Sequence, residues 1–425
     1  MIYNIINYGA LSGDNNLNTV AIQNTINDCS QNGGGTVVVP SGKFITGTIY
    51  LRSNVELHLE MGAVLQASTN RADYNTLDAY PENYEIPQEA WDARHLIVAR
   101  SVENVAITGL GTINGSADVF FEGGELFKPT PGRPTYRYGI KFQKGYSSRM
   151  EDPEVLRPGQ CVVFVSCKNI RIIDISIINT TCWGLFIHGC ENVQVRGYKA
   201  YNDRTFANTD GLDIDTCKNV VVSDCIIDTG DDAIAIRCDS KHLTTNGMDT
   251  CENITITNCV LSSSSCAFRM GVGIGIIKNI TISNIIIPRG GIAFEIHSQY
   301  WLDDHVSFEN IFIRDIICEN TTIPFNLCAT KDCSLKNISF RNFYAKCYNG
   351  AVVVAKERGT FANITVHDMR LIIVPAPFTI PVLDMDGNNM LLDIKNREDV
   401  TLERVNLEVH DEIKALFKDA CEKQI

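Results

Sequence analysis

The chain has 425 residues, 44% of them hydrophobic and 20% charged, a composition that excludes a disordered chain and supplies an ample core. No apolar run is long enough to span a membrane, and a formal net charge of −13 argues against a nucleic-acid partner, because like charges repel. The same charge argues more weakly against a long polyanionic substrate. The length exceeds one ordinary core, so we expect several domains or one long repetitive domain.

The first residues and the cysteine content both bear on the cellular compartment. The opening MIYNIINYGA lacks the basic region, apolar stretch and cleavage site of a secretory signal, so we expect a cytoplasmic protein unless a leader was trimmed. The 16 cysteines come without a C-x-x-C zinc pattern, so we expect buried free thiols. Four of them precede asparagines at a fixed spacing, which indicates a repeat: Cys167, Cys190, Cys217 and Cys251.

The first predicted element is a helix over residues 19–29, where TVAIQNTINDC has helical apolar spacing. The following GGGTVVVP predicts a turn that leads into a strand. Because the terminal coil of a solenoid exposes apolar side chains, this helix is a suitable amino-terminal cap.

A short phrase, asparagine followed by alternating β-branched residues, returns through most of the chain. From Asn169 onward its starts lie 23 to 34 residues apart, a period typical of solenoids and shorter than a propeller blade. The alternation predicts short strands that stack as parallel sheets, with alternate side chains filling the interior. We expect the asparagines to form an internal ladder of stacked amides. They are Asn54, Asn104, Asn169, Asn192, Asn219, Asn253, Asn279, Asn310, Asn337 and Asn363.

We predict one β-helix domain over residues 1–425, interrupted by a polar insertion over about 119–158. Long loops on solenoids usually wall a binding face. At the far end, residues 410–425 (HDEIKALFKDACEKQI) have the spacing of an amphipathic helix that closes or flanks the last coil.

The densest group of carboxylates lies in NTDGLDID, which begins at Asn208, and in TGDDAIAIR, which ends at Arg237. Asp210 and Asp232 are 22 positions apart, about one coil, so the two segments should lie on adjacent rungs roughly 4.8 Å apart. Asp210, Asp231 and Asp232 would then converge on one outer face, and the pKa of at least one should be raised.

Hydrolysis of a glycosidic bond needs one carboxylic acid to protonate the leaving oxygen and one carboxylate to activate water. In inverting enzymes the two lie roughly 6.5–9.5 Å apart, which a cluster spread over two rungs can provide. Asp-Gly and Gly-Asp-Asp are also ordinary turn sequences, but their recurrence one coil apart favours catalysis.

In these motifs the sequence resembles glycoside hydrolase family 28, the polygalacturonase and rhamnogalacturonase family. The resemblance extends to NYGA, AIQNTINDCSQNGGGTVVVPSGKF, GLGTINGS and LRPGQCVVFVSCKNIRI. It implies a right-handed parallel β-helix and metal-free, cofactor-free inverting hydrolysis of an oligosaccharide. Carried over by motif, Asp231 is the general acid, and Asp210 with Asp232 activates water.

Two polygalacturonase motifs, Gly-His-Gly and Arg-Ile-Lys, are missing from the next two coils. Aligning the coils places Cys266 near the expected histidine, and Ala293 and Glu295 near the expected arginine and lysine. That basic pair holds a galacturonate carboxylate, which Glu295 would repel. We therefore predict a neutral, rhamnose-like sugar on the leaving-group side, and the SCAFRMG segment weakly resembles rhamnogalacturonases at this place.

Five further residues are candidates for substrate binding: Asn208, Arg237, Arg269, Glu295 and His297. The two arginines are equally well explained as surface ion pairs, and a histidine at a strand end is more often merely solvated. Trp183, Tyr300 and Trp301 could stack on sugars, although aromatic residues more often pack.

Because no secretory signal is present, we expect the enzyme to trim imported oligosaccharides from one end. Three alternatives stay open: an exo-polygalacturonase, a Ca²⁺-dependent β-helix lyase in which an arginine removes a proton, and a non-catalytic carbohydrate-binding solenoid.

Overall fold

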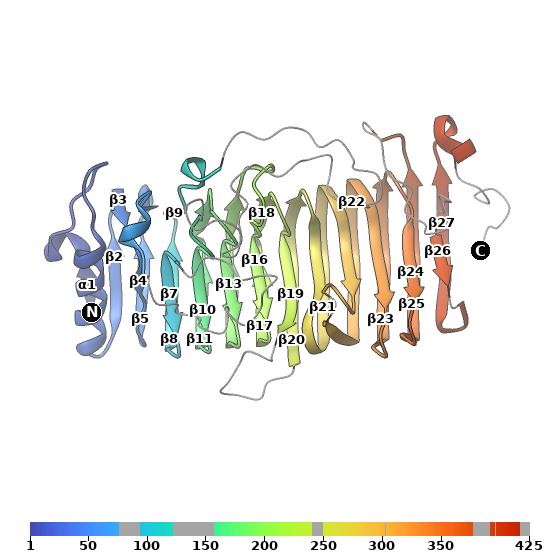
Figure 1. Cartoon of the computed structure of the whole chain (residues 1–425), viewed down its shortest axis with the longest axis horizontal. Helices are drawn as coiled ribbons and strands as arrows, with labels where there is room; N and C mark the ends of the chain where they lie inside the picture. The colour runs from blue at the N-terminus through green and yellow to red at the C-terminus, as the bar shows by residue number, and fades with distance from the viewer. Residues whose placement is uncertain are drawn as a thin grey trace.

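The computed structural model describes residues 1–75, 94–121, 157–239, 250–301, 303–376, 392–395 and 397–416. Within them the strands follow one another along a single long axis from the N-terminal to the C-terminal end (Figure 1). Every named strand belongs to one hydrogen-bonded network, and successive coils pair in parallel, as between β16 (Leu212–Asp215) and β19 (Ile234–Asp239). The predicted stack of parallel strands is therefore confirmed.

Each coil of the first half contributes one strand to each of three sides. The first side contains β4 (Ile49–Tyr50), β7 (Ile97–Arg100), β10 (Val162–Val165), β13 (Leu185–His188), β16 and β19. The second contains β1 (Ile2–Asn4), β2 (Gly35–Val39), β5 (Val55–Leu59), β8 (Glu103–Gly109), β11 (Lys168–Ile173), β14 (Glu191–Arg196) and β17 (Lys218–Ser223). The third contains β3 (Gly42–Thr46), β6 (Ala63–Ala67), β9 (Thr112–Asn114), β12 (Ser176–Ile178), β15 (Lys199–Tyr201) and β18 (Ile226–Thr229).

In the second half most strands continue around the corners of the coil. The long strands are β20 (Thr250–Ser263), β21 (Cys266–His297), β22 (His305–Ala329), β23 (Ser334–Cys347), β25 (Thr360–Ile373) and β27 (Val400–Val409). Two shorter strands, β24 (Ala351–Ala355) and β26 (Leu392–Lys395), extend the first side. The first side thus runs through β21 and β22 to the C-terminal coils.

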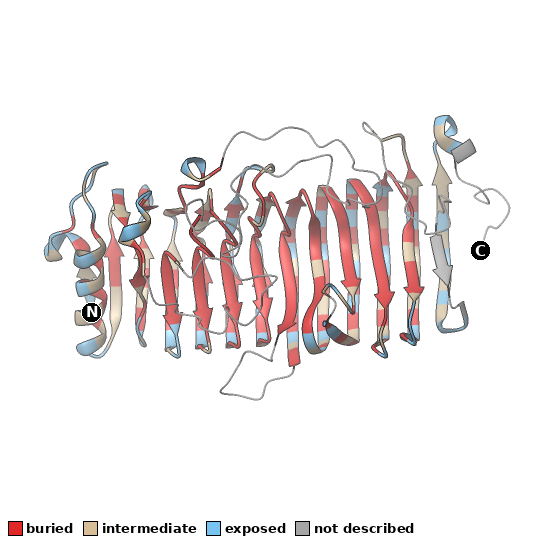
Figure 2. Cartoon of the chain, in the orientation of Figure 1, coloured by how far each residue is buried: buried red, intermediate tan, exposed pale blue. Residues whose placement is uncertain are grey.

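The period-two alternation explains why these segments form strands. In β5, Val55, Leu57 and Leu59 are buried whereas the residues between them are partly exposed. Apolar side chains of successive coils form one continuous core along the axis. Figure 2 shows that most of the strand ribbon along this axis is buried. Each large aliphatic side chain that is buried in this way stabilises the fold by about 1.5–3 kcal/mol.

The ten asparagines form the predicted ladder, but on the outside of the coil. Each side-chain amide donates to the side-chain oxygen of the preceding asparagine at 2.9–3.1 Å, from Asn104 on Asn54 to Asn363 on Asn337. All ten have φ between 49° and 67°, in the left-handed region. The expectation of an internal ladder was wrong, because asparagine here serves the sharp corner, where its short side chain tolerates left-handed backbone.

The 15 cysteines that the structure describes are all free and buried, as predicted. Cys167, Cys190 and Cys217 stack on consecutive rungs, and the backbone N–H of each of the first two donates to the sulfur of the next at 3.4 Å. They behave as small core residues that also satisfy turn backbone groups.

The amino-terminal cap is helix α1 (Thr19–Gln31), which buries Ile22, Thr25, Ile26 and Cys29 against the first coils. Short 3-10 helices lie at Ile5–Tyr8, Arg71–Asp73, Ala117–Val119, Arg397–Asp399 and Asp411–Leu416. The last of these begins the predicted C-terminal helix, whose residues 417–425 lie outside the described part, as do residues 122–156 of the insertion. Among the described helices, none has the length and hydropathy to cross a membrane.

Candidate active site

The candidate site lies where β16 and β19 begin on the first side of the coil. The two strands pair in the register Leu212 to Ile234, and Asp210 and Asp232 precede them by the same two residues. The rung hydrogen bonds continue into the turns, because the Gly211 N–H donates to the Asp232 carbonyl at 2.9 Å. Equal spacing on adjacent rungs therefore brings the two carboxylates together.

A glycine allows the close approach of the turns that carry the aspartates. At Gly230, directly before Asp231, a Cβ atom would lie 2.1 Å from the Phe206 carbonyl oxygen. Its N–H donates to the Thr209 hydroxyl at 3.2 Å, which ties this turn to the Asn208–Asp210 segment. Glycine is required here by space.

The three aspartates form one compact buried cluster. One carboxylate oxygen from each of Asp210, Asp231 and Asp232 lies within 4.8 Å of the others, and the residues are only 4–5% exposed. A single water can bridge two oxygens at this distance, since each hydrogen bond spans about 2.8 Å. The predicted convergence of the three acids is confirmed, but these oxygens lie closer together than the roughly 6.5–9.5 Å that we expected of an inverting pair.

The members of the cluster differ in their partners. Burial raises the pKa of Asp210 well above its ordinary value, and the nearby carboxylates of Asp213, Asp231 and Asp232 raise it further. Among the described residues, nothing hydrogen-bonds to Asp210 Oδ1, which is buried. Asp231 Oδ2 accepts from the Asn208 backbone N–H at 3.2 Å. The cluster thus contains the raised pKa that like charges in a buried site predict.

Asp232 is held by an arginine from the next rung. Burial alone would raise the pKa of Asp232, but the charge and hydrogen bonds of Arg269 outweigh it and hold that pKa below its usual range. Arg269 Nε donates to Asp232 Oδ2, and one terminal nitrogen donates to Oδ1 at 3.3 Å, so the pair is bidentate. The Cys266 N–H also donates to Oδ1, at 3.0 Å. Asp232 is therefore the member that is fixed as a carboxylate.

The register of the following coils matches the alignment made from the sequence. Ala235 pairs with Arg269, and the rings of Phe268 and Phe294 stack at 4.8 Å one residue before Arg269 and Glu295. Glu295 is 7% exposed, and both its oxygens accept from the Asn326 amide at 3.1 Å. Its pKa is raised to about 7, chiefly by burial.

His297 lies at the end of β21, two rungs beyond the aspartates. It is half-buried, and its Nδ1 accepts from the Gln299 N–H at 3.1 Å. Burial lowers its pKa to about 4, assisted by the charges of Lys356 and Arg269. The structure gives it no direct contact with the three aspartates, so its predicted part in binding stays a prediction.

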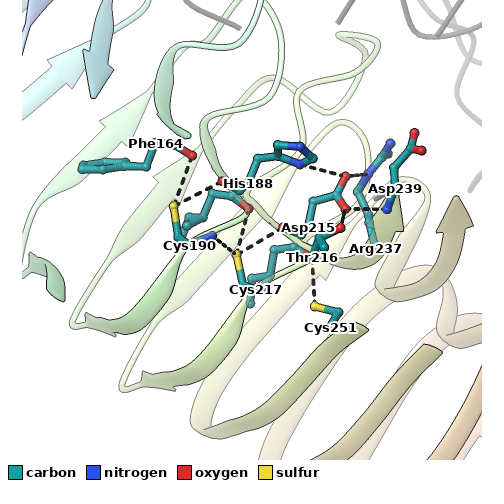
Figure 3. Close-up of polar contacts among 11 residues, drawn as sticks. Phe164, His188, Cys190, Asp215, Thr216, Cys217, Arg237, Asp239 and Cys251 are labelled. Atoms are coloured by element: carbon teal, nitrogen blue, oxygen red, sulfur yellow. Dashed lines mark hydrogen bonds and ion pairs between the residues drawn. The ribbon is translucent and has the colours of Figure 1, made fainter. Parts of the chain in front are cut away.

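Arg237 belongs to a second buried cluster, on the three adjacent strands β13, β16 and β19 (Figure 3). Its Nε donates to Asp215 Oδ2 at 3.2 Å, and His188 Nδ1 lies 3.5 Å from the same oxygen. The Asp239 N–H donates to Asp215 Oδ1 at 2.8 Å, and the guanidinium lies 4.7 Å over the Trp183 ring. Both arginines thus form ion pairs, but not at the surface, because Arg237 is only 4% exposed and the Arg269 side chain 15%. Their predicted part in substrate binding stays a prediction.

Sequence reasoning did not single out His188, Asp213 or Asp215 as members of the site region. Asp213 and Asp215 alternate with core residues Leu212 and Ile214, so the period-two pattern places them on the outer face. His188 pairs with Asp215 in the strand register. The alternation could have placed all three on the outer face. Their pairing could not be predicted, because the unequal loop lengths leave the register between the strands undetermined.

The outer face of the first side is covered where it approaches the aspartates. Val163, Phe186, Asp213, Ala235 and Arg269 follow one another across five rungs, and we call this row the floor column. Its first four members are at most 1% exposed although they point away from the core. On the two rungs before the aspartates, Val163 and Phe186 pack in a buried cluster with Cys182 and Trp183, so this face of the coil is covered there.

Comparison with known proteins finds relatives that are named as polygalacturonases. A "Probable polygalacturonase" from Vitis vinifera is 26% identical over 242 residues, which cover 55% of this chain and 43% of that protein. An "Exo-poly-alpha-D-galacturonosidase" from Dickeya chrysanthemi is 28% identical over 265 residues, covering 55% of this chain and 41% of that protein. The matches thus span less than half the length of these curated relatives.

The fold is shared with a hyperthermoactive exopolygalacturonase from Thermotoga maritima, with a TM-score of 0.67 and 20% identity over 96% of this chain and 92% of that one. The right-handed parallel β-helix is thereby confirmed. The family model for glycosyl hydrolases family 28 matches residues 29–371, which include every aspartate of the cluster. The chain therefore belongs to glycosyl hydrolase family 28.

Proposed function

We propose that the protein is an inverting, exo-acting hydrolase of pectin-type oligosaccharides that releases a neutral, rhamnose-like sugar from the leaving-group side. The observation that carries the hydrolytic part is the buried cluster of three aspartates with unequal partners. Hydrolysis needs a proton donor and a carboxylate that activates water, and a cluster of this kind supplies both.

In the proposed mechanism Asp231 protonates the departing oxygen, and Asp210 with Asp232 activates the attacking water. Arg269 keeps Asp232 ionised at neutral pH. The raised pKa of Asp210 means that the cluster retains a proton, and closely coupled carboxyls titrate as a unit rather than singly. The oxygens lie within 4.8 Å of one another, so one bridging water can carry that proton to Asp231 before it is donated.

The proposal of a neutral leaving sugar rests on the charges beside the cluster. Arg269, the cation on the next rung, already forms a bidentate pair with Asp232. Glu295 follows one rung further and places a carboxyl where polygalacturonases carry lysine. A galacturonate carboxylate at this subsite would therefore lack a free cation from Arg269 and would face Glu295 whenever that group is ionised.

Exo action is supported by the closed face of the earlier rungs. A polymer that crosses the site needs an open path on both sides of the cleaved bond, whereas Val163 and Phe186 on the earlier rungs are covered by Cys182 and Trp183. The insertion that we expected to form this wall lies mostly outside the described residues.

An exo-polygalacturonase is the second candidate, and it is favoured by the comparisons. Both the Dickeya chrysanthemi relative and the Thermotoga maritima structure carry exo-acting names of this kind. The two candidates differ only in the sugar that leaves, so substrate choice separates them.

The test is a panel of pectic oligosaccharides that present either rhamnose or galacturonate on the leaving-group side. We expect kcat/KM to be at least tenfold higher for the rhamnose series, with one sugar released per turnover. Equal or better cleavage of homogalacturonan oligomers would support the exo-polygalacturonase instead.

Two controls address the other classes of function. The oxygens of the three aspartates are close enough to hold a metal ion, so the reaction is repeated with a chelator. Loss of activity together with unsaturated, ultraviolet-absorbing products would indicate a lyase. Asp231→Asn should abolish turnover while the protein stays folded. A wild-type protein that binds sugar but shows no turnover would indicate a non-catalytic solenoid.

A further inference from the structure

An aromatic pair stands directly beside the aspartate cluster, on the segment that follows β21. The Arg269 guanidinium, which is bound to Asp232, lies 4.7 Å over the centre of the Tyr300 ring. One arginine side chain therefore separates Tyr300 from a carboxylate of the cluster. Because β21 follows β19 in the stack, the ring lies on the later rungs, toward the leaving-group side.

Tyr300 is exposed, whereas the carboxylates near it are buried. It is 40% exposed, whereas Asp232 is 4% and Glu295 is 7% exposed. Its place beside the aspartate cluster puts this accessible ring within reach of a ligand bound at the cluster.

The ring is held in place before any ligand binds. Tyr300 packs edge-to-face against Trp301, with ring centroids 4.9 Å apart. The Trp301 backbone N–H donates to Asp304 Oδ2 at 2.7 Å, and Asp304 is itself buried. Together with the guanidinium on one face, these contacts fix the orientation of the ring. The conformational entropy cost of binding a ligand is thereby lower.

A fixed aromatic face suits the C–H groups of a pyranose ring. Such a face adds contact area and dispersion without requiring a charge on the sugar. The adjacent cation, Arg269, is paired with Asp232, so this surface favours a sugar without a carboxylate.

We propose that Tyr300 is the specificity-determining residue that stacks against the leaving-group sugar, an inference that rests on the proposed function. The guanidinium of Arg269 covers one face of the ring, so Tyr300 acts through the part of the ring that stays exposed. Its hydroxyl is not required for stacking.

The test compares Tyr300→Ala and Tyr300→Phe with Tyr201→Ala, which removes a similarly exposed tyrosine, 46% exposed, from β15 on the third side. Steady-state kinetics are measured on the best substrate of the panel, with the pH profile of kcat for each variant. Loss of an aromatic contact predicts a KM about tenfold higher in Tyr300→Ala. Tyr300→Phe and Tyr201→Ala should resemble the wild type.

Two results would overturn the inference. The first is an unchanged KM in Tyr300→Ala. The second is a lowered kcat with a shifted pH profile at constant KM, since Tyr300 would then serve only to support Arg269. Failure of the proposed function is seen separately in the wild type, because an enzyme that prefers galacturonate there contradicts the neutral sugar whatever Tyr300 does.

Discussion

Replacing Arg269 by glutamine should show how far one arginine sets the charge state of the site. The wild-type guanidinium makes a bidentate pair with Asp232, which is 4% exposed. Removing one partner of a buried pair costs about 3–5 kcal/mol of unfolding free energy, because the remaining charge is left uncompensated. Asp232 will escape part of this cost by taking up a proton, so its pKa should rise above the unfolded value.

The pH dependence follows from the sign of that change. In the wild type the depressed pKa of Asp232 contributes stability above the unfolded pKa of about 3.9, and this contribution is lost as the pH falls through the lower folded value. In Arg269→Gln the folded pKa is raised, so the penalty is largest at neutral pH and is relieved in acid. The difference between the two proteins should therefore shrink as the pH falls through the raised folded pKa of the variant, and it should be smaller at pH 4 than at pH 7.

Urea unfolding at pH 7 and pH 4, together with the pH profile of kcat/KM, measures both effects. The matched control is Arg358→Gln, which breaks an equally bidentate pair with Asp332 that is exposed to solvent. The control should lose little stability at either pH. A loss in Arg269→Gln that is no larger than the control, or an acid limb of the activity profile that does not move upward, would refute the reasoning.

Three further predictions concern the ladder, the turn and the subsite. Asn219→Ala should lower stability by about 1–2 kcal/mol and by more than Asn219→Gly, because alanine tolerates left-handed backbone poorly; equal urea midpoints would contradict this. Gly230→Ala should lower kcat without changing the overall circular dichroism, since its Cβ meets the Phe206 carbonyl; an unchanged kcat would argue against a tight turn. In the wild type, cleavage of galacturonate-terminated substrates should fall as the pH rises through about 7, where Glu295 ionises, and Glu295→Gln should remove that fall. A fall of the same size in Glu295→Gln would place its cause elsewhere.

The repeat made much of the fold predictable from the sequence. Period-two alternation and the recurring asparagines indicated parallel stacked strands, because each phrase can satisfy its backbone only through its neighbours. The side of the coil on which the asparagines stand was mispredicted, since alternation does not reveal which residues adopt left-handed φ. Asn192 and Asn219, at φ 59° and 57°, mark corners and not core.

For the site, spacing predicted the meeting of Asp210 with Asp231 and Asp232, because one coil separates them. The role of Arg269 was harder to predict from the sequence. An arginine one rung later can contact either a sugar or a carboxylate, and the direction of its side chain decides which. Predicting the Asp215–Arg237–His188 cluster would have required the strand register between three coils of unequal length. Loop lengths vary freely in a solenoid, so that register emerges only from the folded chain.

The central claim is that the aspartate cluster hydrolyses a glycosidic bond with inversion, and product stereochemistry tests it most directly. Proton NMR during the first minutes of reaction identifies the anomer released before mutarotation. We predict that the wild type first forms the anomer opposite to that of the substrate and that Asp231→Asn forms none. An initial product that retains the configuration of the substrate would contradict the account.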